Sequence, residues 1–195
     1  MSVLVFTFLC LFATPVIAGN VLFSDSFNTE NGGFGVLNYG GFSKWSVSDG
    51  TVDLIGNGFY DFYPGQGLYV DLDGSTSNAG IISSSFILAP GVYELQFMLG
   101  GNARNYPLDE VNVRLAGVYD ETFSVTAAFP LTLITRQIVV SSEASGTLSF
   151  SNAGGDNVGA ILDDVKLTMV PEPASMLLLG FGLIGLAGFA VRRMN

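Results

Sequence analysis

Two aspartates interrupt the apolar faces of the first and last strand-like segments. Carboxylates in such positions raise the question of metal binding. Asp25 shares the apolar side of residues 21–27, and Asp163 shares the apolar side of residues 161–169. An unpartnered carboxylate is costly to bury, so each needs a cation, several N–H donors or access to solvent. If the two strands are neighbours, the pair calls for a cation, and oxygen ligands suit calcium. The alternative is that both carboxylates lie at strand ends, in water or in turn hydrogen bonds.

Other acidic residues occur as adjacent pairs, which raises the question of glycoside hydrolysis. Neighbours on a strand point to opposite faces, so no such pair is by itself the facing couple of carboxylates that glycosidases use. The chain has no histidine and a single cysteine, Cys10, which excludes Ser–His–Asp, Cys–His and histidine–zinc chemistry. An enzyme whose carboxylates meet from distant loops remains an alternative to a non-enzymatic protein. The adjacent pairs are Asp109-Glu110, Asp120-Glu121 and Asp163-Asp164.

Sugar binding has its own candidates among the side chains of loop-like stretches. Flat aromatic faces stack on the apolar faces of sugar rings, and Asn, Asp and Arg bind hydroxyl groups. The competing interpretation is that these side chains only cover the ends of the fold. The net charge of −10 excludes nucleic acid as an expected partner, because phosphates are bound by lysine and arginine. The candidates for sugar binding are Trp45, Tyr60, Tyr63, Arg104 and Tyr106.

The segments that must position these residues have the pattern of an all-β protein. Between residues 19 and 169, short alternating runs are bounded by Gly, Asn, Asp, Ser and Pro, and helical periodicity is absent. One-sided alternation in about ten strands predicts two sheets packed face to face as a jelly-roll sandwich. Residues 28–67 are less regular and predict long loops. The predicted strands are 21–27, 51–55, 67–72, 80–88, 91–99, 110–117, 122–127, 133–141, 144–152 and 160–169.

The N-terminal segment predicts a signal peptide at residues 1–18. An apolar run from Val3 to Ala13 is followed by Pro15 and by a small-residue site, so we expect cleavage after Ala18. Cys10 lies in this segment without the small residue that a lipobox places before its cysteine. The mature chain is therefore expected to have no cysteine and no disulfide. The alternative is an uncleaved, buried helix.

The C-terminal segment predicts a transmembrane helix. Residues 174–191 carry no charge, and as a helix they would be about 27 Å long, close to the hydrocarbon thickness of a bilayer. Arg192 and Arg193 follow directly, and basic residues beside a span stay on the cytoplasmic side, which places the rest of the chain outside. The stretch GFGLIG (180–185) has the glycine spacing of a dinucleotide motif, but no acidic residue follows it to bind a ribose. Its glycines allow close helix packing or are incidental.

The same C-terminal stretch resembles the PEP-CTERM sorting signal. VPEPASMLLLGFGLIGLAGFAVRR (170–193) combines a Val-Pro-Glu-Pro motif, a short apolar span and an arginine pair. The resemblance implies sorting by an exosortase, a membrane transpeptidase-like enzyme of Gram-negative bacteria that make exopolysaccharide. Pro171, Glu172 and Pro173 would form the recognition motif, and Arg192 and Arg193 the cytoplasmic stop. The span would then be temporary, whereas the alternative is a permanent type I anchor.

A second resemblance concerns residues 67–169. Their strand-and-turn phrases, such as GLYVDLDGSTSNAG and FSNAGGDNVGAILDDVKL, resemble the galactose-binding-like jelly roll that builds many carbohydrate-binding modules. In related modules an aspartate near the end of the last strand commonly helps to hold a structural calcium, and Asp163 is the matching position. DLDGS at 71–75 lacks the spacing of an EF-hand and predicts a strand that ends in a turn.

The sequence thus predicts three parts: a signal peptide (1–18), a β-sandwich ectodomain (19–169) and a sorting signal (170–195) with its span at 174–191. The predicted function is that of a non-enzymatic, exported protein of the cell surface or biofilm matrix. Its expected partners are an exosortase, the membrane and an exopolysaccharide bound by the sandwich. The alternatives are a carbohydrate-active enzyme and a purely structural matrix protein.

Overall fold

A computed structural model describes residues 19–104 and 108–171 of the chain. Within these ranges, Asn20–Val170 form one compact unit. A single turn of 3₁₀ helix, η1 (Glu30–Gly33), follows the first strand. The strands are β1 (Asn20–Asp25), β2 (Ser46–Ser48), β3 (Asp53–Gly56), β4 (Leu68–Asp71), β5 (Ile81–Leu88), β6 (Gly91–Gly100), β7 (Asp109–Leu115), β8 (Tyr119–Val125), β9 (Thr132–Val140), β10 (Ala144–Asn152) and β11 (Ile161–Val170).

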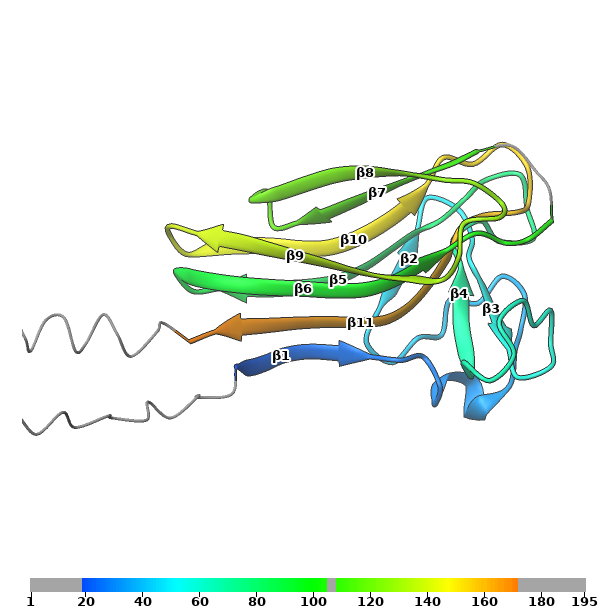
Figure 1. Cartoon of the computed structure of the whole chain (residues 1–195), viewed down its shortest axis with the longest axis horizontal. Coiled ribbons are helices and arrows are strands. Elements are labelled where there is room, and N and C mark those ends of the chain that lie inside the picture. The colour runs from blue at the N-terminus through cyan, green and yellow to red at the C-terminus, as the bar shows by residue number, and fades with distance from the viewer. Residues whose placement is uncertain (1–18, 105–107, 172–195) are drawn as a thin grey trace, which may run out of the picture. The chain divides into compact units, whose positions relative to one another are not determined.

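The strands form two antiparallel sheets that pack face to face (Figure 1). One sheet has the order β3-β4-β11-β6-β9, and β1 pairs with the later part of β11. The other sheet has the order β2-β5-β10-β7-β8. β11 therefore lies between β4 and β6, and β10 lies between β5 and β7. This crossing of late strands between earlier ones is typical of a jelly roll. The predicted all-β, two-sheet jelly-roll sandwich is confirmed.

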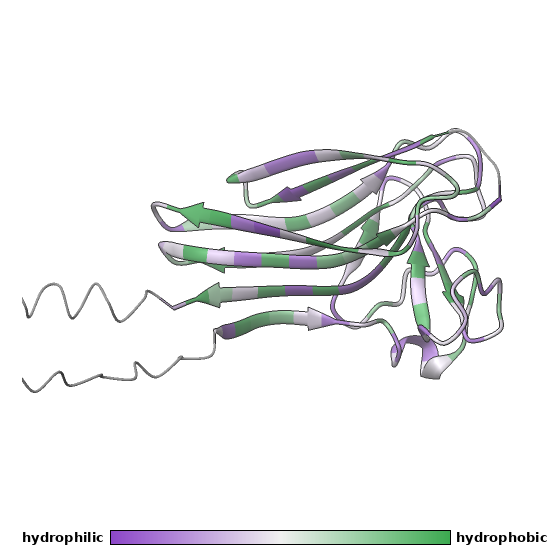
Figure 2. Cartoon of the chain, in the orientation of Figure 1, coloured by the Kyte–Doolittle hydropathy of each residue, from purple (hydrophilic) through white to green (hydrophobic). Residues whose placement is uncertain are grey.

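Alternation of apolar and polar side chains explains both sheets. In β6 the side chains of Tyr93, Leu95 and Phe97 are buried, while the residues between them are partly exposed. Figure 2 shows the same alternation as purple and green bands along the strands. The inner faces meet in a core where, for example, the rings of Phe97 and Phe150 lie 5.2 Å apart, edge to face. Each buried side chain of this size stabilises the fold by about 1.5–3 kcal/mol.

Every predicted strand has a counterpart, and one strand was not predicted. β2 contains only Ser46, Val47 and Ser48 and pairs with the edge of β5. A three-residue segment with a single apolar side chain carries no alternation by which it could be recognised. It lies in the glycine-rich stretch 28–67, where long loops were predicted.

The last strand contains a β-bulge that reverses its side-chain pattern. Asp164 has a φ of +46°, and the register with β6 shifts between Asp163 and Lys166. As a result Leu162 and Val165 both reach the core, although they are three residues apart. The prediction that Asp163 shares a face with Val165 is therefore wrong, because the bulge adds one residue between them.

The terminal segments lie outside the described residues. These are the predicted signal peptide (1–18), the sorting signal beyond Pro171 and the span at 174–191. In the part of the chain that the structure describes, no helix has the length and apolar character needed to cross a membrane.

Candidate functional site

The loop between β3 and β4 carries aromatic side chains predicted for sugar binding. The hydroxyl of Tyr69 on β4 holds the middle of this loop, residues 57–67, because it accepts the N–H groups of Phe62 at 2.5 Å and Tyr63 at 3.0 Å. The same hydroxyl donates to Asp61 Oδ1 at 3.0 Å. Burial is the main cause that raises the pKa of Tyr69 to about 12, so the hydroxyl stays protonated and keeps this role.

Arg104 places a guanidinium group against the rings of this loop. Its Cζ lies 4.6 Å from the ring centroid of Phe62 and 5.7 Å from that of Tyr60. Both distances are within the range of favourable cation–π contacts. Asn102 positions the arginine, since its Oδ1 accepts the Arg104 N–H at 3.0 Å and its Nδ2 donates to the carbonyl of Gly159 at 2.9 Å. Two segments that are far apart in sequence thus bring a cation and two aromatic rings together.

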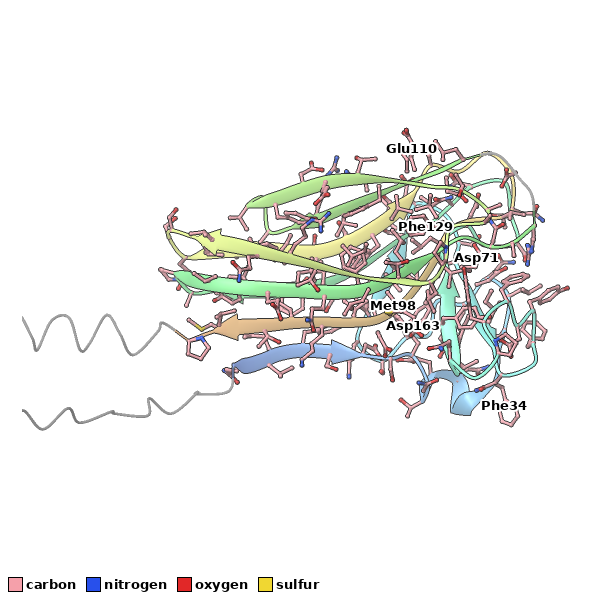
Figure 3. All side chains as sticks on the ribbon, viewed as in Figure 1. Phe34, Asp71, Met98, Glu110, Phe129 and Asp163 are labelled. Atoms are coloured by element: carbon pink, nitrogen blue, oxygen red, sulfur yellow. The ribbon has the colours of Figure 1, made fainter. Side chains whose placement is uncertain are left out.

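Several of these aromatic rings are open to solvent. The side chain of Phe34 is 74% exposed and that of Tyr60 is 53% exposed, and Figure 3 shows Phe34 projecting away from the ribbon. Phe59 contacts Tyr60 edge to face at 4.9 Å. The ring of Phe59 also lies directly on Gly35, where an added Cβ would stand 2.5 Å from a ring carbon. We call this group the aromatic surface and define it as Phe34, Phe59, Tyr60, Phe62 and Arg104.

Tyr63 belongs to the framework beneath the aromatic surface. Its hydroxyl lies 2.5 Å from the carbonyl oxygen of Gly101 and 3.2 Å from that of Phe129. Its ring packs edge to face on Tyr69, at 5.9 Å between centroids. Burial raises the pKa of Tyr63. The side chain therefore ties the loop to the neighbouring strands and presents little of its face to a ligand.

Trp45 lies in the core, which corrects the expectation that it offers an exposed face to a sugar. It is 5% exposed and stacks at 6.0 Å on Phe27. Its ring contacts Phe23 at 4.9 Å and Phe150 at 6.0 Å, both edge to face. Tyr106, the remaining aromatic candidate, lies outside the described residues.

Asp25 and Asp163, the predicted calcium ligands, lie on neighbouring strands but face different sides of their sheet. β1 and β11 pair as expected, and Asp25 stands opposite Val165, whose side chain is in the core. The bulge places Asp163 opposite Met98 on the outer side (Figure 3). The side chains thus face different sides of the sheet, although they are near enough for the charge of Asp25 to contribute to the raised pKa of Asp163.

Each of the two carboxylates has hydrogen-bond donors of its own. Asp25 accepts the Phe27 N–H through Oδ1 and the Trp45 Nε1–H through Oδ2, both at 2.9 Å. Asp163 accepts the N–H of Asp164 at 2.7 Å, and its burial is the main cause that raises its pKa to about 7. Throughout the described ranges, no three His, Cys, Asp or Glu side chains are gathered closely enough to hold a metal.

The adjacent acidic pairs are divided between opposite sides of their strands. In β8, Asp120 pairs with Arg114 at 3.0 Å, and Glu121 pairs with Arg136 at 2.7 Å. In β7, Asp109 is buried while the next residue is exposed. This is the arrangement that strand alternation predicts. The acidic residues of β8 are thus engaged with arginines on two different sides.

A second surface feature is a shallow groove of about 570 Å³ on the outer face of the sheet that contains β5, β7 and β10. Its lining mixes polar and aliphatic groups and has no aromatic ring. It therefore offers hydroxyl groups and one guanidinium but no stacking platform. Its polar side chains include Ser83, Arg114, Ser145, Thr147 and Ser149.

Sequence reasoning identified part of the aromatic surface. Tyr60 and Arg104 were among the candidates, and the structure places them side by side. Phe34, Phe59 and Phe62 were not singled out. The available signal was their position in the glycine-rich stretch 28–67, where bulky apolar side chains have few neighbours to bury them. Their meeting with Arg104 could not be read from the sequence, because it depends on the contact between two loops.

Two comparisons with known proteins bear on identity. Residues 170–193 match the model of the PEP-CTERM protein-sorting motif. No curated protein matches the chain.

Solved structures with a similar fold include domains named as carbohydrate-binding modules. One is TmCBM61 in complex with β-1,4-galactotriose, with 21% identity, a TM-score of 0.44, and coverage of 67% of this chain and 91% of that one. Another is the CBM22-1 xylan-binding domain of Paenibacillus barcinonensis Xyn10C, with 20% identity, a TM-score of 0.46, and coverage of 80% and 98%. A third is the K1 cleaved adhesin domain of Lys-gingipain from Porphyromonas gingivalis W83, with 13% identity, a TM-score of 0.48, and coverage of 76% and 98%. The chain is thus a jelly-roll sandwich followed by a PEP-CTERM protein-sorting motif.

Proposed function

We propose that the protein is exported, that an exosortase sorts it through its C-terminal motif, and that its sandwich binds polysaccharide at the aromatic surface. The observation that carries the binding proposal is the convergence of exposed Tyr60 with Arg104 at one end of the sandwich. The sorting proposal rests on the match at residues 170–193. The protein acts without catalysis, at the cell surface or in the extracellular matrix.

The aromatic surface has the chemistry that a sugar ring requires. Apolar C–H groups on one face of a pyranose stack on an aromatic ring, and Phe34 and Tyr60 offer such rings to solvent. The guanidinium of Arg104 lies against the rings of Tyr60 and Phe62, where it can donate hydrogen bonds to hydroxyl groups. Large apolar side chains gathered on a soluble surface are typical of a binding site. The groove on the outer face of the other sheet has no aromatic ring on which a sugar could stack.

The acidic side chains favour binding over hydrolysis. Glycosidases use two carboxylates that face the same glycosidic bond from separate positions. In β8, Asp120 and Glu121 are occupied by Arg114 and Arg136. None of the four residues belongs to the aromatic surface. A purely structural role without any ligand is the competing outcome of the binding test.

The sorting step assigns roles to residues beyond the sandwich. Pro171, Glu172 and Pro173 form the recognition motif, and Arg192 and Arg193 hold the end of the chain on the cytoplasmic side. The span at 174–191 holds the protein in the membrane until processing. The proposed partners are therefore the membrane, an exosortase and an exopolysaccharide.

A binding assay on the full-length chain in detergent tests the proposal. Affinity electrophoresis and calorimetry would use xylan, β-1,4-galactan and the exopolysaccharide of the native host as probes. Tyr60→Ala and Phe34→Ala are expected to weaken binding about tenfold, equivalent to about 1.4 kcal/mol, because each removes a stacking face. Ile87→Ala and Val139→Ala are matched controls, since these apolar side chains are 71% and 70% exposed outside the aromatic surface. Equal effects in both groups, or no binding by the unaltered chain, would contradict the proposal.

A further inference from the structure

Three buried side chains at one end of the sandwich have polar atoms without a hydrogen-bond partner among residues 19–104 and 108–171. They come from the β4–β5 loop, the start of β7 and the end of β10. Both carboxylate oxygens of Asp73 are unpartnered, and so are Oδ2 of Asp109 and Oδ1 of Asn152. The three side chains are 1%, 7% and 8% exposed, respectively. Buried polar groups are nearly always partnered, so four such oxygen atoms call for an explanation.

The three side chains lie at one end of the sandwich, where one contact joins Asn152 to Asp109 and another packs the loop of residues 153–160 on Asp73. β10 ends beside the start of β7, where Asn152 Nδ2 donates to Asp109 Oδ1 at 3.1 Å. That bond leaves the second oxygen of Asp109 and the amide oxygen of Asn152 free. Asp73 lies close enough to Asp109 and Asp156 for their charges to act on it, and burial together with these charges raises its pKa to about 7. The loop of residues 153–160 packs on Asp73 so closely that a Cβ at Gly159 would stand 2.4 Å from its backbone nitrogen.

A neighbouring aspartate shows how backbone donors, with the charge of Arg104 nearby, satisfy a buried carboxylate in this protein. Asp71, like Asp73, is 1% exposed, and its Oδ1 accepts the N–H groups of Asp73 at 3.1 Å and Gly159 at 2.9 Å. Asp73 receives no such donors. The ion pairs found among the described residues, Arg114–Asp120 and Arg136–Glu121, involve neither Asp73 nor Asp109. The missing partner is therefore not a side-chain cation of the described part of the chain.

We propose that Asp73, Asp109 and Asn152 form a binding site for one calcium ion. Two carboxylates and an amide oxygen supply only oxygen donors, which is the ligand type that calcium prefers, and water or backbone carbonyls complete its coordination. Zinc and copper are disfavoured because the site contains neither nitrogen nor sulfur ligands. Magnesium requires a stricter octahedron and retains its waters, whereas these ligands come from three separate segments. The cation joins the β4–β5 loop, β7 and β10, and it neutralises charge that is otherwise buried.

Calorimetry and thermal unfolding of the full-length chain in detergent test this proposal, with CaCl₂ alone as the probe after removal of metal by EGTA. We expect one site per chain with a Kd on the order of 10⁻⁴ M, as in extracellular modules. Calcium at about 100 times that Kd is expected to raise the Tm by roughly 5–10 °C. The same concentration of MgCl₂ is expected to raise the Tm far less.

Variants separate the site from general charge effects. Asp73→Asn and Asp109→Asn are each expected to weaken calcium binding by at least about tenfold, because each removes an anionic ligand. Asp120→Asn makes the same change of charge at an exposed position and is expected to bind calcium normally. Asn152→Asp adds a third carboxylate, so it is expected to tighten calcium binding and to lower the Tm of the metal-free protein. Circular dichroism of each metal-free variant checks that it is folded.

Several results would overturn the proposal. In one, calcium does not change the Tm of the unaltered chain, and Asp73→Asn has a higher Tm than the unaltered chain. That result would mean that the buried carboxyl groups are protonated rather than bound to a cation. Another is normal calcium binding by folded Asp73→Asn and Asp109→Asn. Equal shifts with magnesium and calcium would overturn the assignment to calcium. None of these outcomes depends on polysaccharide binding, so they leave the proposed function unaffected.

Discussion

Trp45 and Asp25 are joined by a buried hydrogen bond in which the indole Nε1 donates to Oδ2 at 2.9 Å. The indole ring also packs against Phe23 and Phe150 at the boundary between the two sheets. Asp25 is 7% exposed and receives its second hydrogen bond from the backbone of Phe27. The tryptophan therefore acts both as a packing element and as the donor that allows a carboxylate on the inner side of β1.

Replacing Trp45 with phenylalanine is expected to destabilise the sandwich by about 2–4 kcal/mol. The substitution leaves a cavity and removes a donor from a buried carboxylate. Urea unfolding measures the change in the free energy of unfolding. Asp25→Asn and the double variant complete a cycle, in which the double variant should lose less than the sum of the single changes. Full additivity would show that the hydrogen bond contributes nothing of its own.

Removal of the Tyr69 hydroxyl is expected to loosen the aromatic surface more than the core. Tyr69→Phe deprives the N–H groups of Phe62 and Tyr63 of their acceptor, a cost of about 1–3 kcal/mol that falls largely on one loop. Hydrogen exchange should therefore become faster in residues 57–67, and polysaccharide binding should weaken several-fold. Tyr39→Phe is the matched control, because within the described ranges its hydroxyl bonds to Gly41 alone, in an exposed loop. Equal exchange rates in residues 57–67 of both variants would contradict this prediction.

Stability is expected to fall as the pH rises from about 4 to about 7, in part because of Asp163. Burial raises its folded-state pKa to about 7, compared with a usual value of 3.8. Between these values the unfolded chain has released a proton that the folded chain retains, so rising pH favours unfolding. The full penalty, up to roughly 4 kcal/mol, applies above pH 7 and disappears below pH 4.

Asp163→Asn isolates this contribution. The variant is expected to have a higher Tm than the unaltered protein at pH 8 and nearly the same Tm at pH 4, because an amide cannot ionise. Thermal unfolding at several pH values measures the difference, in which the effects of other buried carboxylates cancel. Asp49→Asn, at an exposed position, should show no such pH dependence. A constant difference in Tm across this range would mean that Asp163 does not titrate as described.

Mass spectrometry of the mature protein in its native host tests the sorting step. We expect a C-terminus near Pro173 and an N-terminus at Gly19, because the recognition motif and the signal peptide both mark sites of processing. Substitution of Pro171, Glu172 and Pro173 together should leave the span attached and the protein in the membrane fraction. Replacement of Ile87 serves as a control for expression. An intact Asn195 in the mature protein would favour a permanent anchor.

The fold could be predicted from sequence because its long strands alternate strictly, as in β6 and β10. The exceptions have local physical causes. β2 is too short to show alternation, and the bulge at Asp164 depends on a left-handed backbone conformation that the residue type permits without requiring it. Because of that one inserted residue, Asp163 lies on the opposite face of the sheet from the face that was predicted for it.

The candidate sites were less accessible to sequence reasoning. Tyr60 is exposed and Trp45 is buried, but the sequence does not distinguish them, since both lie in irregular, glycine-rich stretches. Asp73 and Asp109 belong to different segments, and only the folded chain shows that both have buried carboxylate oxygens without a partner among the described residues. DLDGS at 71–75 was expected to be a simple turn, and the burial of Asp73 could not be inferred from that pattern.

The pairing of Asn20 with Met169 has a mechanical consequence. The sandwich is connected to the C-terminal motif through β11, an inner strand bonded to β6 along one side and to β1 and β4 along the other. Hydrogen bonds in antiparallel sheets run across the strands, so a pull on Val170 along β11 loads these ladders in shear, many bonds at once. If the sandwich is held through its C-terminus and binds a glycan, as proposed, tension on that glycan is resisted along the direction in which many hydrogen bonds must break together.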